Sequence, residues 1–372
     1  MSTYHVGSIS GGKDSAAVLL LMMERCPREF IRPIFCDTGN EHPAVYEYLD
    51  YLEQFTGLTI TRLKADFSEQ IKAKRMFIAR DQRVGRTYKR VAKFDRNGNP
   101  EYIRNKSGQV RMFPVFSEVG DEVSGEVIRL EPRQKMGWDS GKKMRWTNKA
   151  KRRALSVLHP TGNPFLDLCL WKGRFPSRKA QFCTEELKRN MAVAFQLDLI
   201  DAGHQVISWQ GVRRDESLNR RNAKKMERIG PRMWAFRPLV DWSALQVFDY
   251  CGSRGLKPNP LYLQGMNRVG CMPCINVSKG ELREIAIRFP DEIQRIAEWE
   301  RLVSFASKRA YTTFMHKGPV EKYIGTPQET FEDGNIQQVV QWSKTTRGGR
   351  QFDLLADLGE PTACASAYGL CE

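Results

Sequence analysis

The first 65 residues alternate between short apolar runs and longer apolar or amphipathic ones. Residues 4–10 (YHVGSIS), 31–37 (IRPIFCD) and 58–65 (LTITRLKA) predict strands. Residues 14–26 are apolar almost throughout, which predicts a buried helix, and residues 42–57 place apolar side chains three and four positions apart, which predicts an amphipathic one. Alternating strands and helices indicate an α/β fold with a doubly wound parallel sheet, in which ligands bind at the carboxyl ends of the strands.

Composition and helix signals divide the chain into four parts. Residues 1–79 begin the α/β domain, residues 80–155 form a basic insert, residues 156–278 complete the domain, and residues 279–372 form a helical cap with a cysteine-containing tail. The pattern of residues 278–310 predicts two helices, with Pro290 at the start of the second, where its missing amide hydrogen is tolerated. No internal repeat is evident.

A glycine-rich loop follows the first strand. Gly7, Gly12 and Lys13 match the spacing of the Walker phosphate loop, but Asp14 stands where that loop has the hydroxyl that holds magnesium. The loop joins a strand to the N-terminus of a helix, where backbone amides and the helix dipole favour an anion. Gly11 and Gly12 let the backbone approach that anion closely. The sequence therefore predicts an anion-binding loop that differs from the Walker type.

Four segments together carry a resemblance to a known family. Residues 10–15 (SGGKDS) resemble the pyrophosphate loop of the adenine-nucleotide alpha-hydrolase superfamily. Residues 35–49 (FCDTGNEHPAVYEYL), 209–221 (WQGVRRDESLNRR) and 236–274 resemble three successive segments of the phosphoadenosine phosphosulfate reductase family within it. The resemblance extends over roughly residues 1–75 and 160–290.

The resemblance implies a nucleotide site for ATP or an adenylyl sulfate. In that superfamily the loop grips a pyrophosphate or an equivalent anion, and reaction at the α-phosphate releases pyrophosphate and leaves an adenylylated intermediate. Lys13 and Asp14 are the implied catalytic residues of the loop, and Asp37 is expected to contact the ribose or a bound metal such as magnesium. The expected nucleotide-binding residues are Ser10, Gly11, Gly12, Lys13, Asp14, Ser15, Asp37, Thr38, Gly39, Gly211, Arg213, Arg214 and Arg220.

The cysteines form a second set of candidate residues. Cys271 and Cys274 make a C-x-x-C pair, whose spacing alone fits a zinc knuckle, a redox pair or part of an iron–sulfur site. Residues 182–188 (FCTEELK) resemble the segment where cluster-containing adenylyl-sulfate reductases carry adjacent cysteines, but Phe182 replaces the first of them. The resemblance thus implies a [4Fe-4S] cluster on Cys183, Cys271 and Cys274, with Cys364 of the tail as fourth ligand and zinc as the alternative metal.

Cys371 is the remaining cysteine of the tail. It is either another candidate for the fourth ligand or a nucleophile that carries sulfur. Sulfate-assimilating reductases of the family end in a glutamate-cysteine-glycine-leucine-histidine motif, whereas this chain ends YGLCE, which weakens the reductase interpretation. Cys26, Cys36, Cys169 and Cys251 lie in apolar surroundings and are predicted to be core residues.

Positive charge is concentrated in the insert. The chain has a formal net charge of +16, and between Arg80 and Arg153 there are 20 lysines and arginines against 9 acidic residues. Trp138 and Trp146 lie among these cations, and a Ser-Gly turn within residues 101–116 predicts a hairpin. Cations neutralise phosphates and aromatic rings stack on unpaired bases, so DNA or tRNA is the expected partner.

The expected location is the cytoplasm, without membrane attachment. No run of about 18 apolar residues occurs, and residues 1–10 lack the features of a signal peptide. Three functions fit the sequence. The first is an ATP-pyrophosphatase-type sulfurtransferase that adenylylates a nucleic-acid substrate and inserts sulfur with the help of the iron–sulfur cluster or a cysteine persulfide. Its expected partner is a cysteine desulfurase or another sulfur or electron donor. The second is an adenylyl-sulfate or phosphoadenylyl-sulfate reductase that produces sulfite. The third is a non-enzymatic nucleic-acid-binding module with an inert nucleotide site.

Overall fold

The computed structural model describes residues 2–82, 93–120, 127–134, 146–216, 220–315 and 327–345. The chain divides into two compact units, Met1–Arg80 with Arg152–Glu372, and Asp81–Lys151. Cys364, Cys371 and Trp138, which the sequence singles out, lie outside the described residues.

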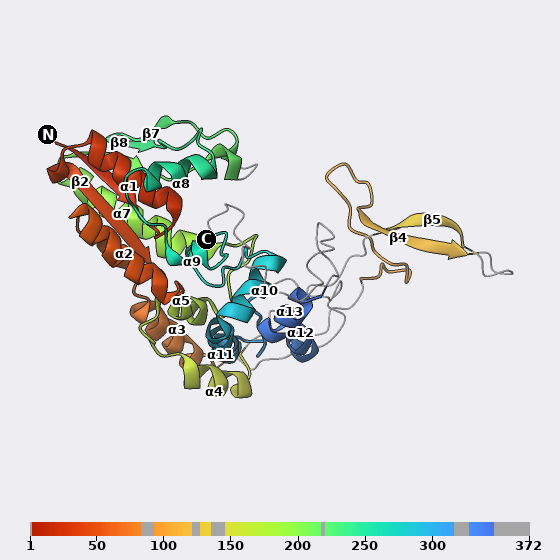
Figure 1. Cartoon of the computed structure of the whole chain (residues 1–372). Helices are drawn as coiled ribbons and strands as arrows, with labels where there is room; N and C mark the ends of the chain where they lie inside the picture. Colours follow the sequence, from red (N-terminus) through yellow and green to blue (C-terminus); the bar gives the residue numbers. More distant parts are fainter. Residues whose placement is uncertain are drawn as a thin grey trace. The chain divides into compact units, whose positions relative to one another are not determined.

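A six-stranded sheet organises the larger unit (Figure 1). Its spatial order is β3 (Thr61–Lys64), β2 (Ile31–Asp37), β1 (Thr3–Ser8), β6 (Gln205–Trp209), β8 (Met233–Phe236) and β7 (Met226–Gly230). The first five strands are parallel, and β7 is antiparallel to β8. β2 and β3 are added in chain order on one side of β1, and β6 pairs with the other side of β1. This confirms the doubly wound α/β fold and puts its topological switch point between β1 and β6.

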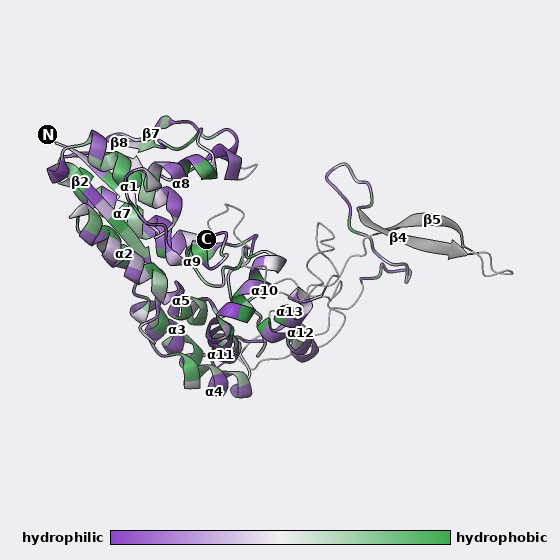
Figure 2. Ribbon diagram, in the orientation of Figure 1, coloured by the Kyte–Doolittle hydropathy of each residue, from purple (hydrophilic) through white to green (hydrophobic). Residues whose placement is uncertain are grey.

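Helices cover both faces of this sheet. Val6 of β1 belongs to a buried cluster with Ile34 and Val206, against which Phe195 of α7 (Asn190–Asp201) packs. The next residue, Gly7, faces the opposite side, because successive side chains of a strand alternate. A Cβ atom on Gly7 would lie 2.5 Å from the sulfur of Met22 in α1 (Lys13–Arg25), so α1 covers the second face. Figure 2 shows the mainly hydrophobic colouring of α1 and β2.

The other helical segments surround this core. They are η1 (Arg28–Phe30), α2 (Pro43–Thr56), α3 (Ser68–Arg80), α4 (Asn148–Val157), α5 (Pro164–Lys172), α6 (Phe182–Thr184), a π-helix (Glu185–Arg189), η3 (Arg214–Glu216), α8 (Ala244–Gly252), α9 (Pro260–Leu263), α10 (Lys279–Arg288), α11 (Pro290–Ala306), α12 (Pro327–Gly334) and α13 (Ile336–Ser343). The two helices expected within residues 278–310 are confirmed, with Pro290 beginning the second. Among the described residues, no helix has both the length and the hydropathy to span a bilayer.

A buried carboxyl group connects three of the C-terminal segments. Glu300 of α11 is 1% exposed, and its two oxygens accept hydrogen bonds from the backbone nitrogens of Phe314 (2.6 Å) and Ile336 (2.9 Å). Burial raises the pKa of Glu300 to about 7, although the two backbone amides act in the opposite direction.

The smaller unit contains two tandem turns of the same design. Asp95 Oδ1 accepts hydrogen bonds from the amides of residues 97 and 99, and Asn105 Oδ1 accepts them from those of residues 107 and 109. Gly98 and Gly108 both have φ +82°, and bridges between residues 94 and 100 and between residues 104 and 110 close the two hairpins. The second hairpin confirms the predicted Ser-Gly turn. The first makes a ten-residue repeat, so the expectation of no internal repeat is wrong.

Two strands follow these hairpins. They are β4 (Met112–Gly120) and β5 (Val127–Gln134), which pair antiparallel. Figure 2 colours the segment 93–111 mostly as hydrophilic.

Candidate nucleotide and cysteine site

The predicted anion-binding loop lies between β1 and α1. Gly11 has φ +74°, a conformation that favours glycine, and its carbonyl oxygen accepts a hydrogen bond from Asn259 Nδ2 at 3.1 Å. Ser15 Oγ donates to Gly12 O at 2.8 Å and accepts from Ser10 N at 3.1 Å. Ser15 thus stabilises the loop internally, and its contact with a ligand stays a prediction.

Lys13 is the first residue of α1. Its Nζ lies 3.4 Å from Asp14 Oδ2 and 5.5 Å from the ring centre of Tyr262, and its side chain is 8% exposed. The backbone nitrogen of Lys13 donates to the Tyr262 hydroxyl at 3.1 Å. Tyr262, which the sequence interpretation missed, therefore positions the start of the helix.

Asp14 connects the loop to the segment that follows β6. Arg213 Nε donates to Asp14 Oδ1 at 2.6 Å, and Arg213 Nη1 donates to Asp215 Oδ1 at 2.5 Å. Arg213 is 3% exposed. A Cβ atom on Gly211 would lie 3.1 Å from two atoms of Asp14, so a residue without a side chain allows this close approach. Asp14 is thus held by an arginine from a distant part of the chain.

The other two predicted arginines also contact carboxylates. Arg214 Nη1 forms an ion pair with Asp241, and its Nε donates to Ala223 O at 3.1 Å. Arg220 forms an ion pair with Glu216, and burial together with the neighbouring positive charge of Arg268 lowers the pKa of Arg220. The contact of these arginines with a ligand anion stays a prediction.

The segment after β2 forms a compact turn. Asp37 Oδ1 accepts hydrogen bonds from Gly39 N (2.9 Å) and from the Tyr46 hydroxyl (2.8 Å). Thr38 Oγ1 donates to Glu41 Oε1 at 2.7 Å, and both residues are buried. The predicted contact of Asp37 with ribose or metal is not tested by these bonds, which use one of its two carboxylate oxygens.

The first cysteine of the C-x-x-C pair is attached to this turn. Glu41 and Cys271 form an antiparallel bridge, and Met272 N donates to Asn40 O at 2.8 Å. Arg295 of α11 donates to both Asn40 Oδ1 (3.1 Å) and Met272 O (2.7 Å). The C-x-x-C pair is thereby fixed beside the carboxyl end of β2.

Three of the four predicted metal ligands lie in one region. Burial raises the pKa of the Cys183 thiol, and the nearby Cys274 raises it further. Burial also raises the pKa of Cys271 to about 11. The cation of Lys188 faces this region, since Cys271 is the main cause of the raised pKa of Lys188. Within the described residues, however, no group of three His, Cys, Asp or Glu side chains is placed to hold a metal ion.

Two cysteines that the sequence assigns to the core have additional neighbours. Cys169 is fully buried, as expected, and burial raises its pKa, with Cys183 adding to the effect. Cys36 is half-buried and lines a cavity at the carboxyl ends of the strands, so the prediction that it is a core residue is corrected. It lies at the carboxyl end of β2, where a parallel sheet opens to ligands.

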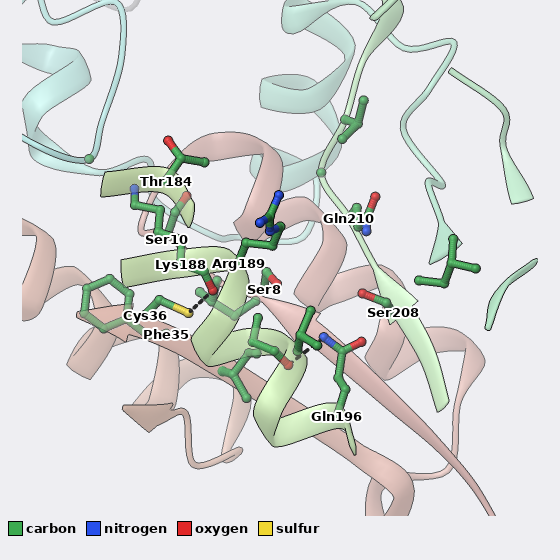
Figure 3. A pocket seen from close by; sticks show the side chains of 18 of the residues that line it. Ser8, Ser10, Phe35, Cys36, Thr184, Lys188, Arg189, Gln196, Ser208 and Gln210 are labelled. Atoms are coloured by element: carbon green, nitrogen blue, oxygen red, sulfur yellow. Dashed lines mark hydrogen bonds between the residues drawn. The ribbon is translucent and has the colours of Figure 1, made fainter. Parts of the chain in front are cut away.

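A cavity of about 400 Å³ lies at the switch point of the sheet. Its walls include Ser8 at the end of β1, Ser10 in the loop that follows, Phe35 and Cys36 of β2, and Ser208 of β6 (Figure 3). Lys188 and Arg189 of the π-helix and Gln196 of α7 complete it on the helical side (Figure 3). A cavity of this size at the switch point is suited to a nucleoside.

A second cavity, of about 510 Å³, adjoins the first. Arg174, Lys179 and Arg189 line it together with the acidic Glu185, and it shares Thr184 and Arg189 with the first cavity. A tight turn closed by mutual backbone bonds between Ser177 and Ala180 carries Lys179. The site therefore joins a nucleoside-sized cavity to a basic one beside Cys183.

Sequence reasoning missed several residues of the cavities. Lys188 and Arg189 follow Cys183 closely in sequence, and a π-helix, which is frequent at functional sites, turns them toward the cavity. The adjacent cations Lys188 and Arg189, five and six positions after Cys183, were the available signal. Gln196 lies two helical turns further, and nothing in its local sequence marks it.

A cavity at the switch point and a glycine loop between β1 and α1 are typical of nucleotide-binding α/β folds. The family described as "Phosphoadenosine phosphosulfate reductase domain" matches residues 4–277. The chain therefore belongs to the phosphoadenosine phosphosulfate reductase family.

Three similar proteins illustrate how far the likeness extends. The "Uncharacterized 37.8 kDa protein in gpa 5'region" of Escherichia phage 186 is 40% identical over 381 aligned positions, which cover 100% of this chain and 97% of the phage protein. The adenosine 5'-phosphosulfate reductase of Burkholderia cepacia is 32% identical over 90 residues, which cover 24% of this chain and 32% of that enzyme. The phosphoadenylyl-sulfate reductase structure from Candida auris is 13% identical, with a TM-score of 0.35 over 74% of this chain and 83% of that one.

Proposed function

We propose that this protein is an ATP-pyrophosphatase-type sulfurtransferase that adenylylates a nucleic-acid substrate and then replaces the activated oxygen with sulfur. The observation that carries the proposal is that two cavities lie next to each other and share the lining residues Thr184 and Arg189. The first cavity, next to the glycine loop, suits ATP. The second contains three cations and one carboxylate, which suits the phosphates of a polyanion.

In the first step, an acceptor oxygen attacks the α-phosphorus of ATP. The bond from that phosphorus to its bridging oxygen breaks, and pyrophosphate leaves. Lys13 supplies positive charge where the leaving group gains negative charge. The guanidinium of Arg213, bonded to the carboxylate of Asp14, reduces the repulsion between that carboxylate and the phosphates.

In the second step, the terminal sulfur of a cysteine persulfide attacks the adenylylated centre. AMP leaves with the original oxygen. A second thiol then attacks the carrier sulfur, which breaks the S–S bond, leaves the new sulfur on the substrate and forms a protein disulfide. An external dithiol reduces that disulfide. Cys371 is the proposed carrier, and a cysteine desulfurase is the proposed donor of the persulfide sulfur.

A [4Fe-4S] cluster on Cys183, Cys271, Cys274 and Cys364 is a separate part of the proposal. The effect of Cys274 on the pKa of Cys183 supports a shared location, but the described thiols are not placed as a metal site. No reaction step above depends on the cluster. Anaerobically purified protein should be brown and contain iron and acid-labile sulfide, and the Cys274→Ser variant should lose both. Colourless protein with stoichiometric zinc would identify zinc as the metal.

The reductase is the alternative function. It is favoured by the 32% identity over 90 residues to an adenosine 5'-phosphosulfate reductase. A reductase would release sulfite from an adenylyl sulfate without consuming ATP.

Substitution of Lys13 tests the role of the loop. Conversion of ATP to AMP and pyrophosphate should fall at least a hundredfold in Lys13→Ala, since Lys13 adjoins the leaving group. Lys225→Ala, which removes an exposed lysine outside the cavities, is the control and should retain turnover. Equal turnover by wild type and Lys13→Ala would remove the loop from the mechanism, and nucleic-acid binding without any turnover would identify a binding module.

A further inference from the structure

One residue that lines the nucleoside-sized cavity has a buried polar atom without a hydrogen-bond partner among the described residues. Gln196 lines this cavity and is 3% exposed. Its Nε2 donates to Ala192 O at 2.9 Å, whereas its buried Oε1 accepts no hydrogen bond within the described residues. Buried acceptors are nearly always bonded in folded proteins, so this oxygen indicates a missing donor.

The orientation of the amide group follows from the same contact. Exchange of the oxygen and nitrogen positions would bring the side-chain oxygen against Ala192 O, and two acceptors repel each other. This orientation keeps Oε1 of Gln196 without a donor, and a carbonyl oxygen can only accept a hydrogen bond from a ligand. The ligand must bring an N–H or O–H group to this point.

The remainder of the cavity indicates which part of a nucleotide reaches Gln196. The loop residue Ser10 and the cation Lys188 lie at one end of the view, and Gln196 lies at the other (Figure 3). Gln196 is seven residues after Arg189, about 10 Å along a helical path. Phosphates belong with the loop and the cations, so the base extends toward Gln196.

The cavity is suited to a planar base. Ile34 and Met233 line the cavity, are buried and belong to the cluster that packs against α7, so they offer apolar surface to a ring. Among purines, adenine carries an amino group at position 6, whereas hypoxanthine and guanine carry an oxygen there.

We propose that Gln196 Oε1 accepts a hydrogen bond from the 6-amino group of adenine and thereby selects adenine over 6-oxopurine nucleotides. The inference deepens the proposed function, on which its nucleotide site rests. With ITP, the oxygen at position 6 would face Gln196 Oε1, so two acceptors would meet in a buried place. A site that bonds a substrate N–H discriminates strongly against an analogue that lacks it.

The test is equilibrium binding of ATP and ITP, with magnesium and without nucleic acid, to the full chain. Wild type should bind ATP at least tenfold more tightly than ITP. Gln196→Met, which keeps the side-chain length but removes the acceptor, should weaken ATP binding about tenfold and should not weaken ITP binding, because the repulsion between two acceptors is also removed. The preference for ATP should then disappear.

Gln210→Met is the matched control, because Gln210 lines the same cavity but its Oε1 already accepts from Arg237 Nε at 2.9 Å. This variant should retain the preference for ATP over ITP. If Gln196→Met weakens the binding of ATP and of ITP equally, Oε1 contacts the ribose and the proposal is overturned. Equal affinities of wild type for ATP and ITP would also overturn the proposal. If wild type binds neither nucleotide, both the proposed function and this inference are overturned. If wild type prefers ATP but does not convert it to AMP and pyrophosphate, only the proposed function is overturned.

Discussion

Glu300 makes the stability of the protein depend on pH in a calculable way. The carboxyl group is 1% exposed, and its pKa rises from 4.5 in the unfolded chain to about 7 in the folded one. Between these values the unfolded chain has lost a proton that the folded protein retains. Stability from this group is therefore fully present below about pH 4.5 and is lost as the pH rises through about 7.

The magnitude follows from the shift in pKa. A difference of about 2.5 pKa units corresponds to about 3 kcal/mol between pH 4.5 and pH 8. Glu300→Gln removes the titration and replaces one acceptor oxygen with an amide nitrogen, which cannot accept from a backbone N–H. The variant should therefore be less stable than wild type at pH 5, and this difference in stability should shrink by about 2.5 kcal/mol, or about 3 °C in Tm, at pH 8.

Thermal unfolding at pH 5, 6, 7 and 8 measures this gap. Glu298→Gln is the control, because Glu298 lies on the same helix but is exposed and paired with Arg301. Its gap to wild type should stay nearly constant between these pH values. A constant gap for Glu300→Gln would refute the reasoning, because the carboxyl group would then titrate equally in the folded and unfolded chains.

Three further predictions concern the loop and the small unit. Arg213→Met should lower Tm by several degrees and weaken ATP binding, since it leaves the partly buried Asp14 without its arginine partner. Asp14→Asn in the same background should recover part of the lost Tm, and no recovery would show that the two residues are not energetically coupled. Gly211→Ala should weaken ATP binding about tenfold with little change in Tm, because its Cβ would press on Asp14, and unchanged affinity would show that the loop adjusts freely. Arg96 and Lys106 are exposed and occupy equivalent positions in the two hairpins. Replacing both by serine should reduce the slope of log K for nucleic-acid binding against log salt concentration by about 2, whereas the control Lys72→Ser should leave that slope unchanged. An unchanged slope in the double variant would exclude the hairpins from the binding surface.

Local patterns were sufficient to predict the framework of the site. The glycine loop is specified within six residues, because the conformation of Gly11 and the start of α1 depend on neighbouring residues. The alternation of strands and helices likewise predicted the doubly wound sheet. Pro290 marked the start of α11 for the same reason, since a proline restricts its own backbone.

Contacts between distant residues were not predictable from those patterns. Asp14 and Arg213 are 199 positions apart, and the sequence gives both residues as ligand contacts without indicating that they bond to each other. The attachment of Cys271 to Glu41 depends in the same way on tertiary packing. The repeat in the small unit was missed because its two turns share a side-chain role and a glycine but few identical residues.

Pyrophosphate release from ATP by anaerobically prepared full-length protein, with and without DNA or tRNA, tests the proposed sulfurtransferase most directly. Sulfite release from adenylyl sulfate and phosphoadenylyl sulfate is measured in parallel. Stimulation of pyrophosphate release by one of the nucleic acids is the predicted result and would identify the class of acceptor. Sulfite formation without ATP turnover would contradict the proposal and establish a reductase.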